Sequence, residues 1–184
     1  MKNQTNASDS LVFPFLFVGI LWIVKGIEVL FSLNFSYLGI VPRNSLGLIG
    51  ILTGPLIHAN FVHLFSNSIP LLVLGIIVFN FYRTIAFEIF IWIYLISGLC
   101  VWIVGENASH IGASGLIYGF ASFIFFSGLF RRELKSILLA ILVAIVYGSI
   151  LRGIFPGNPA ISWQGHLFGA MAGGLCAYFF RKEK

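Results

Sequence analysis

The stretch G112-A-S-G-L-I-Y-G119 decides how the rest of the chain is interpreted. Ser114 lies between small residues at the predicted start of an apolar helix that runs to Phe130. A polar side chain is rare in a membrane span, and glycines allow another backbone to come close. The start of a helix also offers free N–H groups and the positive end of the helix dipole. The stretch therefore predicts either a nucleophile beside an oxyanion site or small-residue packing between helices.

The composition predicts an integral membrane protein. Of the 184 residues, 59% are hydrophobic and 9% are charged, whereas a soluble domain carries about 25% charged residues. The net charge of +5 comes from Lys and Arg beside apolar runs, so it predicts membrane orientation and no nucleic-acid partner. Cys100 and Cys176 lie inside apolar runs, which indicates small buried side chains rather than a disulfide or a metal site.

Six apolar segments approach the roughly 20 residues that a helix needs to cross a bilayer. We therefore predict an all-α membrane protein, with a polar cytoplasmic tail at residues 1–10 and a single six-helix domain at 11–184. The first apolar segment is followed by no small-residue cleavage site, so it is expected to remain as a span. The predicted spans are residues 11–33, 61–82, 85–104, 114–130, 134–151 and 164–180.

The basic residues predict the orientation of these spans. With the N-terminus inside, eight of the eleven Lys and Arg residues fall at inner ends, so both termini are expected to be cytoplasmic. His63, Ser114 and His166 then fall near the outer ends of their helices, in one leaflet. The three basic residues expected on the outer side are Lys25, Arg43 and Arg152.

Two outer loops have unusual compositions. The first, residues 34–60, is mostly apolar, and its 46–52 run is too short to span, which predicts an interfacial or partly membrane-embedded segment. The fifth, residues 153–163, contains F-P-G-N-P and is expected to be a turn, with a mobile lid as the alternative.

Polar residues on two other spans complete a candidate site with Ser114. His63 and Asn67 are four residues apart, so they lie on one face of a helix. His166 precedes Gly169 on a face of small residues, which a neighbouring helix can approach closely. The alternatives are hydrogen bonds between helices for all three side chains, or a proton relay for His166.

Two further features bear on the chemistry. Tyr118 follows Ser114 by four residues, so its ring can stack on an imidazole, or simply pack. No acid is well placed to complete a triad, and the candidate considered for that position is Glu106 in an outer loop. A Ser–His dyad suffices if another group orients the imidazole ring. The chain has no H-E-x-x-H motif for zinc and no pair of membrane aspartates, so the other kinds of intramembrane protease are not expected. The prediction includes no metal and no cofactor.

Three motifs in this order resemble the rhomboid family of intramembrane serine proteases, over about residues 42–174. They are H58-A-N-F-V-H-L-F-S-N67, G112-A-S-G-L-I-Y-G119 and G165-H-L-F-G-A-M-A-G-G174. The resemblance implies a compact six-span domain of the bacterial inner membrane, with Ser114 as nucleophile and His166 as general base and acid. It also implies oxyanion donors at His63 and Asn67.

The resemblance implies supporting roles as well. Tyr118 corresponds to a ring that stacks on the histidine, and His58 to a structural histidine of the first loop. The small residues of the site are Gly112, Gly115 and Gly169. Some members carry a Trp–Arg pair in the first loop, and here those positions are Ile49 and Gly50, so no role for that pair is carried over.

The implied substrates are membrane-anchored proteins cut in or near a transmembrane helix, preferably after a small residue. Gly or Pro in the substrate would help, because a regular helix hides its carbonyl groups. One alternative is a non-catalytic relative that binds transmembrane helices, although such relatives usually lack the serine or the histidine. Another is a small transporter with a histidine relay, for which inverted repeats are common; none is evident here.

Overall fold

The structure, a computed structural model, describes residues 7–157 and 162–183. Within these ranges every regular element is a helix, and the only β-type pairing is an isolated antiparallel bridge between Ile40 and His110. This confirms the predicted all-α class. The main helices are α1 (Ala7–Leu30), α3 (Phe61–Phe81), α4 (Ala86–Val104), α5 (Ser114–Arg131), α6 (Leu134–Tyr147) and α7 (Trp163–Phe179). The short ones are α2 (Gly50–Thr53) and the 3-10 segments η1 (Ser36–Leu38), η2 (Leu46–Leu48), η3 (Gly54–Leu56) and η4 (Gly148–Ile154).

Five helical segments in the described ranges are long and apolar enough to cross a membrane. Many of their large apolar side chains face outward, such as Leu16 at 60% and Ile23 at 62% exposure, and a lipid surrounding explains such a surface. The protein is therefore an integral membrane protein. The five segments are Leu11–Leu30, Phe61–Phe81, Ala86–Val104, Ser114–Arg131 and Leu134–Ile154. The sixth predicted span corresponds to α7, which has 17 residues and is shorter, so a count of six remains a prediction.

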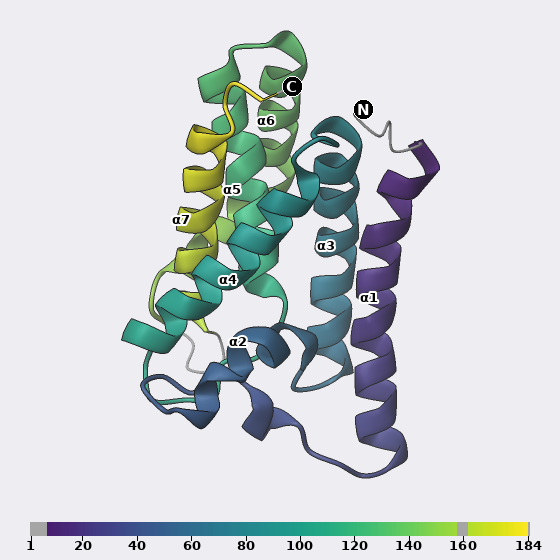
Figure 1. Cartoon of the computed structure of the whole chain (residues 1–184), viewed down its shortest axis with the longest axis vertical. Helices are drawn as coiled ribbons and strands as arrows, with labels where there is room; N and C mark the ends of the chain where they lie inside the picture. The colour runs from purple at the N-terminus through teal and green to yellow at the C-terminus, as the bar shows by residue number, and fades with distance from the viewer. Residues whose placement is uncertain (1–6, 158–161, 184) are drawn as a thin grey trace.

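The helices form a bundle around α5, which contacts α3, α4, α6 and α7 (Figure 1). The start of α1 and the end of α7 lie at one end of the bundle, and α2 lies at the opposite end. The chain therefore alternates in direction, and the first turns of α3, α5 and α7 all lie at the α2 end. The three helices that carry the candidate residues thus begin near one another.

Glycines let α5 and α7 touch backbone to backbone. A Cβ atom on Gly169 would overlap the carbonyl oxygen of Gly115 and lie 2.8 Å from its carbonyl carbon. One turn further, a Cβ atom on Gly173 would overlap the carbonyl oxygen of Gly119 in the same way. The small-residue face of α7 therefore packs directly on α5, as its spacing predicted.

Polar caps fix the starts of α3 and α7. The Asn60 side chain accepts a hydrogen bond from the His63 N–H at 2.8 Å, and the Ser162 hydroxyl accepts one from the Gly165 N–H at 3.3 Å. Such caps satisfy N–H groups that have no partner within the helix. Each cap therefore fixes the first turn that carries one of the candidate histidines.

The first loop is held to the bundle by two basic side chains. Lys25 forms a buried ion pair with Glu28 at 2.7 Å, and its Nζ also donates to the His58 carbonyl at 3.1 Å. Arg43 donates to the Gly105 carbonyl at 2.9 Å, which joins this loop to the loop before α5. The turn that leads into α3 is therefore fixed from the α1 side.

Candidate active site

Ser114 and His166 meet at the close contact between α5 and α7. The Ser114 Oγ lies 2.9 Å from His166 Nε2, within hydrogen-bond distance. Ser114 is the first residue of α5 and is half-buried, and His166 is in the first turn of α7 with only 8% of its surface exposed. The arrangement has the geometry of a nucleophile paired with a base.

Tyr118 stacks on the His166 ring. The two ring centroids are 4.1 Å apart and the planes differ by 9°, so the rings are parallel. The four-residue spacing to Ser114 leaves open either this stack or ordinary packing, and the family resemblance implies the stack. Neither predicts a partner for the hydroxyl, which donates to the Ile150 carbonyl at 2.6 Å. The tyrosine is thus fixed at its tip as well as by its ring.

The second nitrogen of His166 also has a partner. His166 Nδ1 lies 2.9 Å from the carbonyl oxygen of Gly153, which belongs to η4. Gly153 and Ile150 could not be recognised as site residues from the sequence, because both contribute only backbone oxygens. Glu106, the weak acid candidate, instead accepts a hydrogen bond from Trp163 Nε1 at 3.2 Å.

His63 lies against Gly112, two residues before Ser114. Gly112 has a φ of +107°, and a Cβ atom on it would lie 2.7 Å from His63 Cε1. A residue with a side chain would therefore be strained and would displace the imidazole. Gly112 is thus required both by its backbone conformation and by the close approach of His63.

His58 contacts both His63 and the backbone just before Ser114. Its ring is 2% exposed, contacts the His63 ring edge to face at a centroid distance of 5.0 Å, and accepts a 3.5 Å bond from the Ala113 N–H at Nε2. Burial, together with the nearby His63, lowers the pKa of His58 to about 4. His58 is therefore neutral near pH 7, and its structural role stays a prediction.

Asn67 lies one helical turn beyond His63 and is 5% exposed. Its amide nitrogen donates to the His63 carbonyl at 3.0 Å, and its Oδ1 is buried with no donor among the described residues. Because an amide nitrogen carries two hydrogens, one remains for another acceptor. No direct bond joins Asn67 to Ser114 within the described ranges.

Backbone N–H groups are available at the start of α5. The Gly112 N–H donates to the Gly54 carbonyl, and the Ala113 N–H donates to His58 Nε2. Further along, the Leu116 N–H donates to the Ala113 carbonyl. Within the described residues, no acceptor is found for the N–H of Ser114 or Gly115. Such N–H groups at a helix start can bind an anion.

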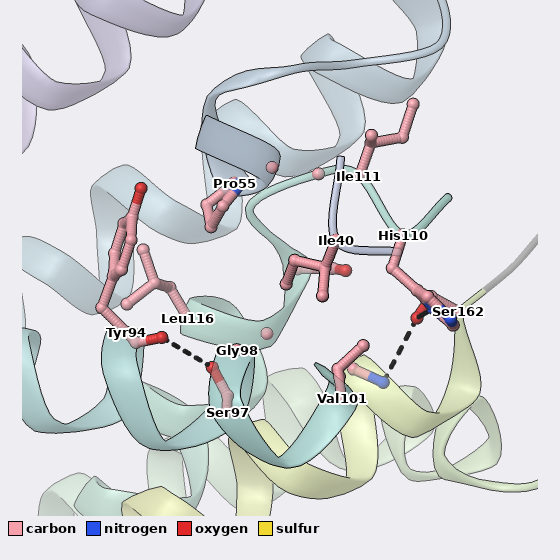
Figure 2. A pocket seen from close by; sticks show the side chains of 15 residues that line it. Ile40, Pro55, Tyr94, Ser97, Gly98, Val101, His110, Ile111, Leu116 and Ser162 are labelled. Carbon is pink, nitrogen blue, oxygen red and sulfur yellow. Dashed lines mark hydrogen bonds between the residues drawn. The ribbon is translucent and has the colours of Figure 1, made fainter. Parts of the chain in front are cut away.

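A small cavity adjoins Ser114 between α4 and the loop before α5 (Figure 2). Its volume is about 40 Å³, which is enough for about three water molecules at roughly 10–15 Å³ each. Polar groups in its lining include Ser97, His110 and Ser162, and the last two are bonded to each other at 2.6 Å. The cavity can therefore hold water next to the serine.

Known proteins resemble the chain over most of its length. The model of the Rhomboid domain matches residues 46–183. An uncharacterized protein of Mycobacterium tuberculosis is 42% identical over 176 residues, covering 88% of this chain and 71% of the relative. An uncharacterized Mycobacterium leprae protein is 37% identical over 175 residues, which cover 88% of this chain and 68% of the relative. A Bacillus subtilis protein named "Putative rhomboid protease YdcA" is 28% identical over 146 residues, which cover 73% of this chain and 68% of the relative. The chain belongs to the rhomboid family.

Proposed function

We propose that this protein is an intramembrane serine endopeptidase in which Ser114 is the nucleophile and His166 is the general base. The observation that carries the proposal is the 2.9 Å distance between Ser114 Oγ and His166 Nε2. Membership of the rhomboid family supports it, because the motifs that resemble that family supply both residues. Within the described residues there is no cluster of His, Cys, Asp and Glu that suits a metal ion.

The reaction follows the chemistry of a Ser–His pair. As the Ser114 Oγ attacks the scissile carbonyl carbon, its proton moves to His166 Nε2. His166 then gives this proton to the leaving amine, and an acyl-enzyme ester remains on Ser114. Water attacks the ester with His166 again as base, which releases the acid product and restores the serine. The small cavity beside Ser114 is a suitable source of that water.

Three donors are proposed for the oxyanion of the tetrahedral intermediate. The Ser114 N–H has no other acceptor among the described residues, His63 lies against Gly112, and Asn67 retains one amide hydrogen. Preorganised donors at such a place stabilise the charge that develops in the transition state. The site therefore combines one backbone donor with two side-chain donors.

The proposed substrates are membrane-anchored proteins cleaved in or near a transmembrane segment. The candidate site lies at one end of a bundle whose outer surface is apolar, so an anchored substrate can reach it from the bilayer. We further propose that residues 11–184 form one domain, that α7 is its sixth span and that the 46–52 run of the first outer loop is partly embedded. The basic residues favour cytoplasmic termini in a bacterial inner membrane.

The second candidate function is a non-catalytic protein that binds transmembrane helices. Such a protein has no need of a serine in hydrogen-bond contact with an imidazole, and this chain has one. Cleavage separates the two candidates. The purified protein is reconstituted into liposomes with a single-pass substrate that carries Gly or Pro near its outer end. We expect two fragments that depend on Ser114, whereas intact substrate that co-purifies with the protein would favour the binder.

Asn67→Ala is expected to lower kcat about 10²–10³-fold, which is typical for the loss of one oxyanion donor. The remaining donors, His63 and the Ser114 N–H, prevent a complete loss. Ser66→Ala is the matched control, because the Ser66 hydroxyl donates to the same His63 carbonyl, at 2.9 Å, and has no proposed part in the reaction. Steady-state cleavage is measured for both variants. Equal rates in the two would reduce Asn67 to a structural hydrogen bond.

Tyr118→Ala is expected to lower kcat by about 10²-fold, because the His166 ring loses the face that positions it. Tyr118→Phe keeps the stack but leaves the Ile150 carbonyl without its donor, so we expect a smaller loss of about fivefold, or roughly 1 kcal/mol. The rates of both variants are measured beside the parent protein. Losses of equal size would show that the hydroxyl, and not the ring, is what matters.

A further inference from the structure

Two backbone carbonyl groups of η4 hold the aromatic pair at the proposed active site. The Gly153 oxygen lies 2.9 Å from His166 Nδ1, and the Ile150 oxygen accepts the Tyr118 hydroxyl at 2.6 Å. A 3-10 helix has three residues per turn, so carbonyls three positions apart project from the same side. One short segment therefore contacts both rings of the stack at once.

Gly153 lies at the end of this segment, where a carbonyl has no partner further along the helix. The last carbonyl oxygens of a helix need hydrogen-bond donors from elsewhere, and here the histidine ring provides one. In the described residues no carboxylate bonds to His166. The place that an acid occupies in a Ser–His–Asp triad is therefore filled by a backbone oxygen.

We infer that η4 is a positioning element for the base, in which the Gly153 carbonyl selects the tautomer of His166 and the Ile150 carbonyl fixes Tyr118 behind it. The inference rests on the proposed function. A carbonyl oxygen only accepts hydrogen bonds, so the neutral ring carries its proton on Nδ1. The unprotonated Nε2 then faces the Ser114 hydroxyl and can accept its proton. In a triad, the acid fixes the tautomer and orientation of the histidine in the same way.

Close packing at Gly153 makes the inference testable. A Cβ atom at this position would overlap the Tyr118 hydroxyl and lie 2.9 Å from His166 Nδ1. By contrast, a Cβ atom on Gly148, at the other end of η4, meets no atom within 4 Å. Alanine at Gly153 therefore pushes the segment off both rings, while alanine at Gly148 leaves it in place.

The contact also links catalysis to the position of the loop. Both hydrogen bonds come from the same turn, so a displacement of η4 removes them together. The base is then oriented only while η4 rests against the ring pair. The fifth loop, which is expected from the sequence to be a turn, begins at Gly153 and so has a part in the site through that carbonyl; its residues 158–161 lie outside those that the structure describes.

The test compares Gly153→Ala with Gly148→Ala in two assays on the reconstituted full chain. The first is the rate at which a fluorophosphonate labels Ser114, which needs the base but no protein substrate. The second is cleavage, analysed as kcat and KM separately. We expect Gly153→Ala to lower the labelling rate and kcat by about 10²-fold, the scale of a 1 Å misplacement, with KM and the melting temperature unchanged. Gly148→Ala is expected to behave like the parent protein.

A double variant shows whether the effect passes through the ring pair. In a Tyr118→Phe background the hydroxyl that the new Cβ overlaps is absent, so Gly153→Ala is expected to cause a smaller additional loss than it does alone. Parental labelling and kcat in Gly153→Ala would overturn the inference, as would losses that add fully in the double variant. A parent protein that is never labelled would contradict the proposed function instead, so the two failures are distinguishable.

Discussion

Replacing Ser114 with alanine is expected to abolish cleavage and to leave the melting temperature close to that of the parent protein. Loss of the nucleophile in a serine protease lowers kcat on the order of 10⁶-fold. Ser114 is half-buried and its hydroxyl makes one hydrogen bond, to His166, so removal of this small group takes away little packing. Alanine is also a strong helix former at the first position of α5.

His166→Ala should lose cleavage to the same extent but should melt at a lower temperature than Ser114→Ala. The imidazole is 8% exposed and stacks on Tyr118, so its removal leaves a buried space as well as an inactive site. Cleavage of a reconstituted substrate is followed beside a thermal melt for both variants. Substantial activity in either folded variant would show that the Ser–His assignment is wrong.

Gly169→Val is expected to lose both activity and stability, which separates it from Ser114→Ala. The first atom of any side chain at this position would overlap the carbonyl oxygen of Gly115 on α5, and backbone cannot move aside as a flexible side chain can. The two helices must then separate, and a 1 Å displacement between reacting groups can lower the rate about 10²-fold. Overpacking of this kind typically destabilises a fold by about 1–3 kcal/mol.

The matched control for this variant is Gly19→Val in α1, where a Cβ atom meets nothing within 4 Å. The control carries the same glycine-to-valine change in a helix but has no neighbouring backbone to displace. Melting temperature and cleavage rate are measured in the same detergent for both. If Gly169→Val melted and cleaved like the control, the contact between α5 and α7 would not be what brings His166 to Ser114.

Much of this site could be predicted because side-chain spacing determines which residues share a helix face. The interval from His166 to Gly169 predicted a close approach by another helix, and the structure has that approach at Gly115. The four-residue interval from Ser114 to Tyr118 likewise placed the ring on the face of the serine, where the structure has it stacked on His166. These spacings lie within a single helix, so the shared face can be predicted without knowledge of the tertiary structure.

The backbone contribution to the site could not be predicted from sequence. Every residue has a carbonyl group, so nothing marks those of Ile150 and Gly153 as partners of Tyr118 and His166. The same limit applies to Arg43, whose bond to the Gly105 carbonyl joins two loops that are distant in sequence. Such contacts depend on how the loops return to the bundle.

Helix ends also differ from the predicted ones. The first helix runs from Ala7 to Leu30 rather than over residues 11–33, and α6 ends at Tyr147, where the chain tightens into η4. Hydropathy indicates where a chain is apolar, but hydrogen bonds and caps decide where a helix begins and ends. The Gly153 carbonyl that contacts the imidazole lies in the 3-10 helix that follows Tyr147.

Fluorophosphonate labelling of the intact membrane protein tests the central claim most directly. The parent protein, Ser114→Ala and His166→Ala are reconstituted, exposed to the probe and digested, and the modified peptide is identified by mass spectrometry. The proposed dyad predicts a single adduct on Ser114 in the parent protein and none in either variant. An unlabelled parent protein, or an adduct that persists in Ser114→Ala, would contradict the assignment of Ser114 as an activated nucleophile.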